Sequence, residues 1–199
     1  MTNLTTPTTK SVKVKRDYLT EEEIRTLIEI AKNDGRHGKR NALLLLVMYR
    51  HGLRVSEAID LTWDQIDFTR GSILIHRKKN GLASNQPLSG KELRELRSIK
   101  RNTKSHHVFV SERGSPMTSS NIRMIFSRLR ERVLSRPYLG TITGPIHAHA
   151  LRHACGHKLA DEGIDTRRIQ DYLGHKNIQN TQRYTQLSAN KFRGFDKLI

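Results

Sequence analysis

The sequence predicts a mainly α-helical protein with one small antiparallel β-sheet, an α+β fold. Three observations predict this class. Apolar residues recur at three- and four-residue spacing in several blocks of the 199 residues, capping residues precede some of these blocks, and one β-branched stretch is followed by an Asn-Gly turn. A chain of this length usually forms one domain. We therefore expect one folded domain over residues 17–199, preceded by a flexible basic tail over residues 1–16.

The expected helices follow from their caps and apolar faces. Thr20 and Glu23 form a capping box that opens the first helix. The continuous apolar run 42–47 indicates that the second helix is deeply buried, and Gly52 stops it. After Thr20, helices are expected at about residues 39–50, 55–61, 89–101, 118–133, 149–162, 166–173 and 181–187, with a short one beyond Ala189.

The expected strands lie in the middle of the chain. Residues 72–76 are rich in β-branched side chains, residues 78–81 contain the Asn-Gly turn, and residues 84–88 form the returning strand of a hairpin. A further short strand is expected at residues 107–110.

The charge of the chain indicates a polyanionic partner. Lys and Arg number 36 against 19 Asp and Glu, a formal net charge of +17. Such an excess is typical of nucleic-acid-binding proteins, although a basic protein without specific chemistry would also fit. No apolar run is long enough to span a membrane, no signal-peptide core opens the sequence, and one cysteine, Cys155, cannot form an internal disulfide. We expect a cytoplasmic protein, with Cys155 as a buried thiol.

Two arginines stand in unusual contexts. Arg54 follows the helix-ending His-Gly-Leu of residues 51–53, and Glu57 lies one helical turn further on, where it could orient the guanidinium. Arg152 lies near the start of a helix, three residues after His149, so that both could contact one phosphate. His149, His153 and His157 share a helix face, but no acid is interleaved among them, which disfavours a metal site.

A third block completes an ordered pattern. Residues 173–175 read Leu-Gly-His, and Tyr184 follows nine residues after His175. Residues 52–57 read Gly-Leu-Arg-Val-Ser-Glu, and residues 149–153 read His-Ala-Leu-Arg-His. In this order the three blocks resemble the signature of the tyrosine recombinase (phage integrase) family. Residues 163–175 and the length of the chain resemble the Fim-type invertases, which flip a promoter segment in fimbrial phase variation.

The resemblance implies a catalytic-domain fold without a separate core-binding domain, and DNA cleavage and rejoining through a 3′-phosphotyrosine without metal or ATP. Arg54 and Arg152 would clamp the phosphate, Tyr184 would attack it, His175 would donate to a phosphate oxygen, and His149 would help to take the tyrosine proton. Glu57 and His153 would support these groups. The implied partners are double-stranded DNA with short inverted sites and DNA-bending accessory proteins. The implied assembly is a homotetramer on two sites, in which residues 189–199 dock on a neighbouring protomer.

The resemblance also implies a hairpin lysine that protonates the leaving 5′-oxygen. Counting back from Pro87 places Lys79 at that position, although Lys78 is adjacent and alternate strand residues face opposite sides. Two other functions remain open: an integrase or excisionase of a mobile element, and a non-cleaving basic DNA-binding protein on the same fold. A type IB topoisomerase would share the chemistry but fits the length and motifs less well.

Overall fold

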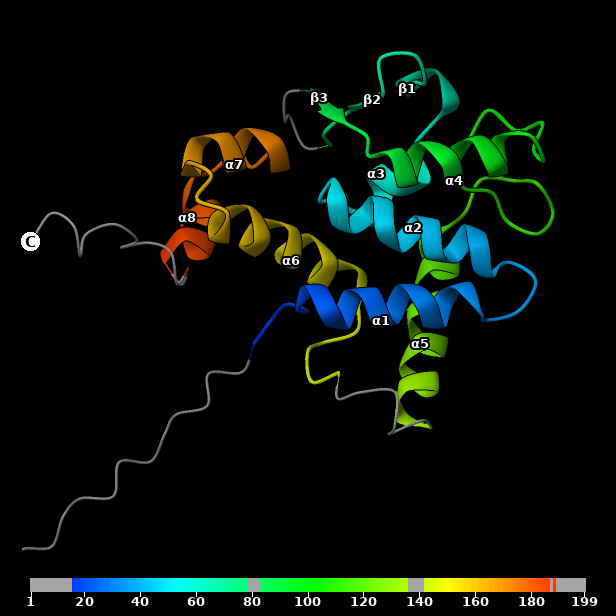
Figure 1. Ribbon diagram of the computed structural model, residues 1–199, viewed down its shortest axis with the longest axis horizontal. Coiled ribbons are helices and arrows are strands. Elements are labelled where there is room, and N and C mark those ends of the chain that lie inside the picture. The colour runs from blue at the N-terminus through cyan, green and yellow to red at the C-terminus, as the bar shows by residue number, and fades with distance from the viewer. Residues whose placement is uncertain (1–15, 79–82, 136–141, 187, 189–199) are drawn as a thin grey trace, which may run out of the picture.

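The computed structural model describes residues 16–78, 83–135, 142–186 and 188, and these form a mainly helical fold around one small sheet (Figure 1). The predicted fold class is therefore confirmed. The helices are α1 (Glu21–Lys32), α2 (Gly38–Arg50), α3 (Val55–Ile59), α4 (Gly90–Lys100), α5 (Ser119–Leu134), α6 (Ala148–Asp161), α7 (Thr166–Leu173) and α8 (Gln179–Gln186). The strands are β1 (Ile66–Asp67), β2 (Ser72–Ile75) and β3 (Ser84–Pro87), and a 3₁₀ turn, η1, covers Trp63–Gln65.

Helix α2 lies at the centre of the fold and packs against both α1 and α6 (Figure 1). Most of its apolar run is buried, as predicted: Leu44, Leu45 and Val47 have no exposed surface, whereas Leu46 is partly exposed. The expected capping box opens α1: Glu23 N–H donates to Thr20 Oγ1 over 3.2 Å, and the Glu23 carboxylate accepts from Thr20 N–H. These local signals fix where each helix begins.

The sheet has the strand order β1-β2-β3, and both pairs are antiparallel. The predicted hairpin is confirmed by the β2–β3 pair, in which Ile75 opposes Ser84. The turn between them, residues 79–82 with Lys79, lies outside the described residues.

The expected strand at residues 107–110 is wrong. That segment makes only isolated bridges, from His107 to Thr62 and from Val110 to Pro116. Val108 and Phe109 are both buried, so consecutive side chains enter the core instead of alternating across a sheet. The two-residue strand β1 was not predicted, because it is too short to show a period.

The helices α6, α7 and α8 form a second, smaller apolar cluster beside the main core. Its buried members are Cys155, Ala160, Ile169, Leu173 and Tyr184. Gly52 joins this cluster to the end of α2: its φ is +56°, and a Cβ there would collide with the Leu173 side chain. The first and third sequence blocks are thus in direct contact, which places the site at the boundary of the two clusters.

Candidate active site

The centre of the site is a buried carboxylate surrounded by three arginines. Glu57 Oε1 accepts from Arg54 Nη1 over 2.6 Å, and Glu57 Oε2 accepts from Arg77 Nη1 over 2.9 Å. Arg152 Nη1 lies 3.9 Å from the same Oε2. Burial alone would raise the pKa of Glu57, but the Arg54 backbone N–H and the charges of Arg77 and Arg54 outweigh it, so that the pKa lies below its usual value. Glu57 is therefore ionised and orients the guanidinium groups.

Arg152 is held in the interior by main-chain carbonyls from two distant segments. Its Nη1 donates to Gly52 O and its Nη2 donates to Leu173 O over 2.7 Å. The side chain is almost fully buried, and this burial, together with the charges of Arg54 and Arg77, lowers the pKa of Arg152 to about 10. Arg152 therefore remains charged at neutral pH, in a setting where little water screens it.

Arg54 is the more accessible member of the pair. A quarter of its side chain (26%) is exposed, and its Nη2 is 3.5 Å from Gly174 O. Since Arg54 and Arg152 both lie beside Glu57, the structure brings together two arginines that are 98 residues apart in the sequence. Two planar, permanently charged forks at one place suit a phosphate group.

Tyr184 lies on α8 with its ring enclosed and 1% of its surface exposed. Its hydroxyl is 2.9 Å from His153 Nδ1, and its ring packs on His157 and His175 at centroid distances of 5.0 and 6.2 Å. Burial raises the pKa of Tyr184 to about 12, although Arg152 and Arg183 oppose the shift. In this structure the hydroxyl is thus a protonated group held inward by His153, and not by His149.

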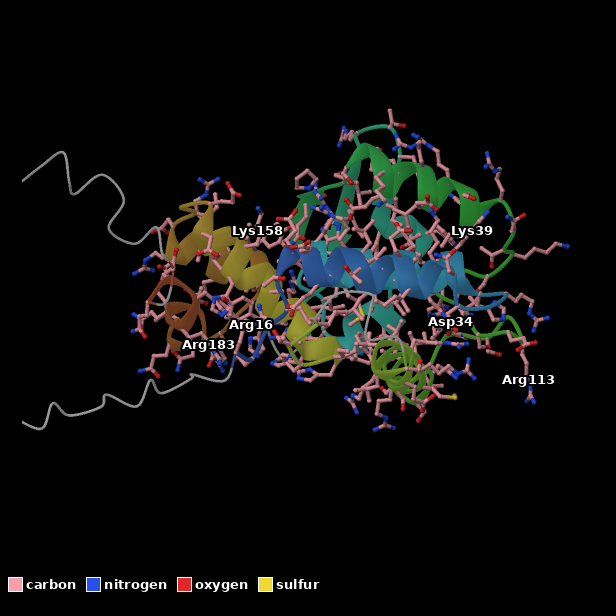
Figure 2. The ribbon with its side chains drawn as sticks, turned by 60° about the horizontal axis from the view of Figure 1, so that its bottom comes forward. Arg16, Asp34, Lys39, Arg113, Lys158 and Arg183 are labelled. Atoms are coloured by element: carbon pink, nitrogen blue, oxygen red, sulfur yellow. The ribbon has the colours of Figure 1, made fainter. Side chains whose placement is uncertain are left out.

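An acidic residue, Asp17, lies close to the histidines that surround Tyr184. Asp17 accepts a hydrogen bond from Arg183, the neighbour of Tyr184, and is 4.0 Å from both His153 Nε2 and His157 Nε2. Figure 2 shows Arg183 near Arg16, close to the point where the chain enters the fold. The segment just before α1 therefore closes over the tyrosine.

The two other predicted histidines differ in their surroundings. His175 Nδ1 is 2.9 Å from Thr181 Oγ1, and burial followed by the charges of Arg152 and Arg54 lowers its pKa to about 3. His149 lies at the surface with its ring 4.4 Å from that of His153, and desolvation and Arg152 lower its pKa. Both are neutral at pH 7 in the absence of an anion.

The structure brings together Arg54, Arg152, His175 and Tyr184, with Glu57 and His153 between them and His149 at the rim. Lys79 lies outside the described residues, and the neighbouring Lys78 forms an ion pair with Asp60. Arg77 was missed by the sequence analysis. It follows Ile73 and Ile75 on the buried face of β2, so the two-residue alternation could have shown that this arginine points inward.

The described residues contain neither a cluster of metal-ligating side chains nor a membrane-spanning helix. No group of three or more His, Cys, Asp or Glu side chains there could hold a metal ion. None of the helices in the described ranges is long and apolar enough to cross a membrane. Cys155 is buried as expected, and burial raises the pKa of its thiol to about 12.

Residues 17–191 match the model of the phage integrase family. This chain belongs to the phage integrase family. The prediction from the three sequence blocks is thereby confirmed. The family relatives include the type 1 fimbriae regulatory proteins FimE and FimB of Escherichia coli strain K12, which are 40% and 41% identical over 90% of this chain; the alignments cover 90% and 89% of those proteins.

Solved structures of the phage integrase family share the fold. The XerA recombinase superimposes with a TM-score of 0.73 at 26% identity, over 92% of this chain and 65% of that one. The Tn1549 transposon integrase in complex with a circular intermediate DNA gives a TM-score of 0.75 at 20% identity, over 96% of this chain and 68% of that one.

Proposed function

We propose that this protein inverts a DNA segment between short inverted repeats by cutting and rejoining strands through Tyr184, and that it thereby switches fimbrial expression. The chain is a site-specific recombinase of the tyrosine class, as its family membership and its similarity to FimE and FimB establish. The observation that carries the mechanism is the meeting of Tyr184, Arg152 and Glu57, which belong to three separate sequence blocks, in one buried cluster. DNA is the partner that suits this chemistry and the net charge of +17.

The phosphate would bind between Arg54 and Arg152. Strand transfer mainly requires that the charge building up on the non-bridging oxygens is stabilised. Arg54 and Arg152 would supply two positive charges. His175 lies close enough for both arginines to lower its pKa, and it would donate a hydrogen bond to the same phosphate. An arriving phosphate adds negative charge beside His175 and so raises its pKa from about 3, which favours its role as a donor.

The attack requires Tyr184 to leave its contact with His153. The tyrosine oxygen then forms a bond to phosphorus while the bond from phosphorus to the 5′-oxygen breaks. The tyrosine proton passes to His149, which lies one helical turn before His153 and is more accessible. The 5′-oxygen takes its proton from Lys79. Rejoining reverses these steps, because the phosphotyrosine bond conserves the energy of the broken bond.

The test is to trap the covalent complex. The full chain is expressed in a bacterium that carries its gene neighbourhood, the cells are lysed in denaturant, and DNA attached to the protein is sequenced. We expect a small set of sites arranged as inverted repeats, and no covalent DNA from Tyr184→Phe. The affinity of Tyr184→Phe for those sites should stay within tenfold, because one hydrogen bond is worth about 1 kcal/mol.

The control and the alternatives use the same assay. Tyr49→Phe removes the hydroxyl of a tyrosine on α2 that packs at the edge of the second apolar cluster but is not one of the proposed reacting groups, and it should leave the covalent complex intact. Tight binding without any covalent DNA from the unaltered protein would indicate a non-cleaving DNA-binding protein. Sites in direct orientation, with excised circles in the cell, would indicate an integrase or excisionase instead of an invertase.

The assembly that acts is proposed to be a tetramer on two sites in the nucleoid, because an inversion joins four DNA ends. Residues 189–199, which would dock on a neighbouring protomer, lie outside the described residues. DNA-bending proteins would help to bring the two sites together. Sedimentation of the protein on a two-site DNA should reveal four protomers, and two would contradict this assembly.

A further inference from the structure

Arg77 lies two residues after the end of β2, where it contacts the segment before Arg54 and the end of α7. Its Nη1 donates to Glu57 Oε2 over 2.9 Å and to Gly52 O over 3.4 Å. Its Nη2 donates to His51 O over 2.9 Å and to Tyr172 O. One side chain thus connects the hairpin, the segment before Arg54 and the end of α7.

These contacts are not explained by stability alone. Arg77 is buried, and its Nε has no hydrogen-bond partner among the described residues. A buried ion pair of this kind is often no more stabilising than an apolar pair, because both ions lose their hydration. The Gly174 position is also adapted to Arg77, since a Cβ there would lie 2.5 Å from Arg77 Cγ.

Glu57 Oε2, which lies near both Arg77 and Arg152, indicates the role of Arg77. Arg77 Nη1 occupies Oε2 at 2.9 Å, while Arg152 Nη1 is 3.9 Å from the same oxygen. If Oε2 lost Arg77, the uncompensated carboxylate would attract Arg152, which needs to move by only about an ångström to form a direct ion pair. That movement would turn Arg152 away from the phosphate.

We propose that Arg77 is a positioning residue that neutralises Glu57 Oε2 and so keeps Arg152 free to bind the phosphate. The proposal rests on the proposed recombinase chemistry, in which Arg152 is part of the clamp. It requires an arginine, because a planar fork can donate to Glu57 from Nη1 and to His51 O from Nη2 at once. A lysine has one nitrogen and cannot hold both partners in this geometry.

The test compares Arg77→Lys with the unaltered full chain on a nicked duplex that carries the site recovered from the covalent complex. We expect single-turnover cleavage to fall about 100-fold, as when one preorganised donor is lost from a reaction site. The Kd for the duplex should change less than about threefold, because most affinity comes from other phosphate contacts. Arg40→Lys is the matched control, since Arg40 is partly buried and bonds to Val110 O far from Glu57, and it should cleave normally.

A second variant distinguishes positioning from folding. Glu57→Gln added to Arg77→Lys removes the charge that attracts Arg152 and leaves an amide oxygen for Arg54. Cleavage by this double variant should recover about tenfold over Arg77→Lys, since the competing ion pair is gone. Equal impairment of the single and double variants would overturn the proposal. Rescue of Arg77→Lys by a 5′-bridging sulfur, which leaves without a proton, would also overturn it, because the defect would then lie in the hairpin acid.

A crystal structure of Arg77→Lys tests the same inference without DNA. We expect Arg152 Nη1 within hydrogen-bond distance of Glu57 Oε2, and an unchanged separation would contradict the inference. If the unaltered protein forms no covalent complex, the proposed function fails, whereas the crystal structure still decides whether Arg77 controls the position of Arg152.

Discussion

His153 and His175 are uncharged at neutral pH, because burial and neighbouring positive charges lower their pKa values to about 4 and about 3. In the unfolded chain each would titrate near 6.5. Unfolding therefore takes up protons between pH 6.5 and 4. The stabilisation from these neutral histidines is complete above pH 6.5 and is lost as the pH falls toward the folded-state pKa values.

The resulting prediction concerns the pH dependence of stability. The free energy of unfolding, measured in urea, should fall steadily from pH 6.5 to 4.5. His153→Gln removes one titrating group, so the slope should become shallower by up to about 1.4 kcal/mol per pH unit. An identical slope in the variant would show that His153 is protonated in the folded protein.

At single residues, sequence reasoning could predict which side chains the structure brings together but not their contacts. Arg54, Arg152, His175 and Tyr184 stand in ordered local blocks, so their types and spacing indicated that they would lie at one place. Arg77 belongs to no block, and the contact between His153 and Tyr184 depends on how α8 packs on α6. Such contacts depend on packing between segments that are distant in the sequence.

Among the elements, α6 approaches α8 closely at a glycine, Gly156. A Cβ at Gly156 would lie 2.5 Å from Tyr184 Cε2. Gly156→Ala should therefore lower the free energy of unfolding in urea by about 1–3 kcal/mol, which is typical of overpacking. In a Tyr184→Ala background the same change should stabilise the protein by up to about 1 kcal/mol, because alanine is the better helix former. An equal cost in both backgrounds would contradict the contact.

The β2–β3 hairpin is the element that should carry the general acid. Lys79→Ala should slow cleavage severely on ordinary DNA, and a 5′-bridging sulfur should restore the cleavage step because a thiolate needs no proton. Lys78→Ala is the matched control, since Lys78 pairs with Asp60. Rescue of Lys78→Ala alone would shift the assignment by one residue.

Most elements could be predicted because their signals are local. The capping box at Thr20 and the apolar run of α2 indicate where α1 and α2 lie, and the helix expected from residue 89 is α4, which begins at Gly90. The segment at residues 107–110 was mistaken for a strand because a buried connection and a strand have similar composition. Its pairing partners, Thr62 and Pro116, each supply a single bridge.

For the whole molecule, the basic tail should set part of the salt dependence of DNA binding. Arg16 belongs to the fold, because its guanidinium contacts Glu23 and Thr143. Deleting residues 1–15 would remove Lys10, Lys13 and Lys15, and each neutralised phosphate contributes about 0.9 to the log–log salt slope. The slope should decrease by up to about 2.7. Full-length protein with all three lysines changed to glutamine should match the deletion, and an unchanged slope in both would show that these lysines do not bind the DNA backbone.

The burial of Tyr184 also affects whether the protein cleaves DNA while it is bound to an unrelated sequence. A protein with a net charge of +17 binds any duplex, so a search for its site involves many encounters with unrelated phosphates. With a pKa of about 12, only about one phenol in 10⁵ is ionised at pH 7, and 1% of the residue's surface is exposed. In the proposed mechanism, sliding along the chromosome would therefore leave the DNA intact, because a nick requires both a phosphate in the clamp and the release of Tyr184 from His153.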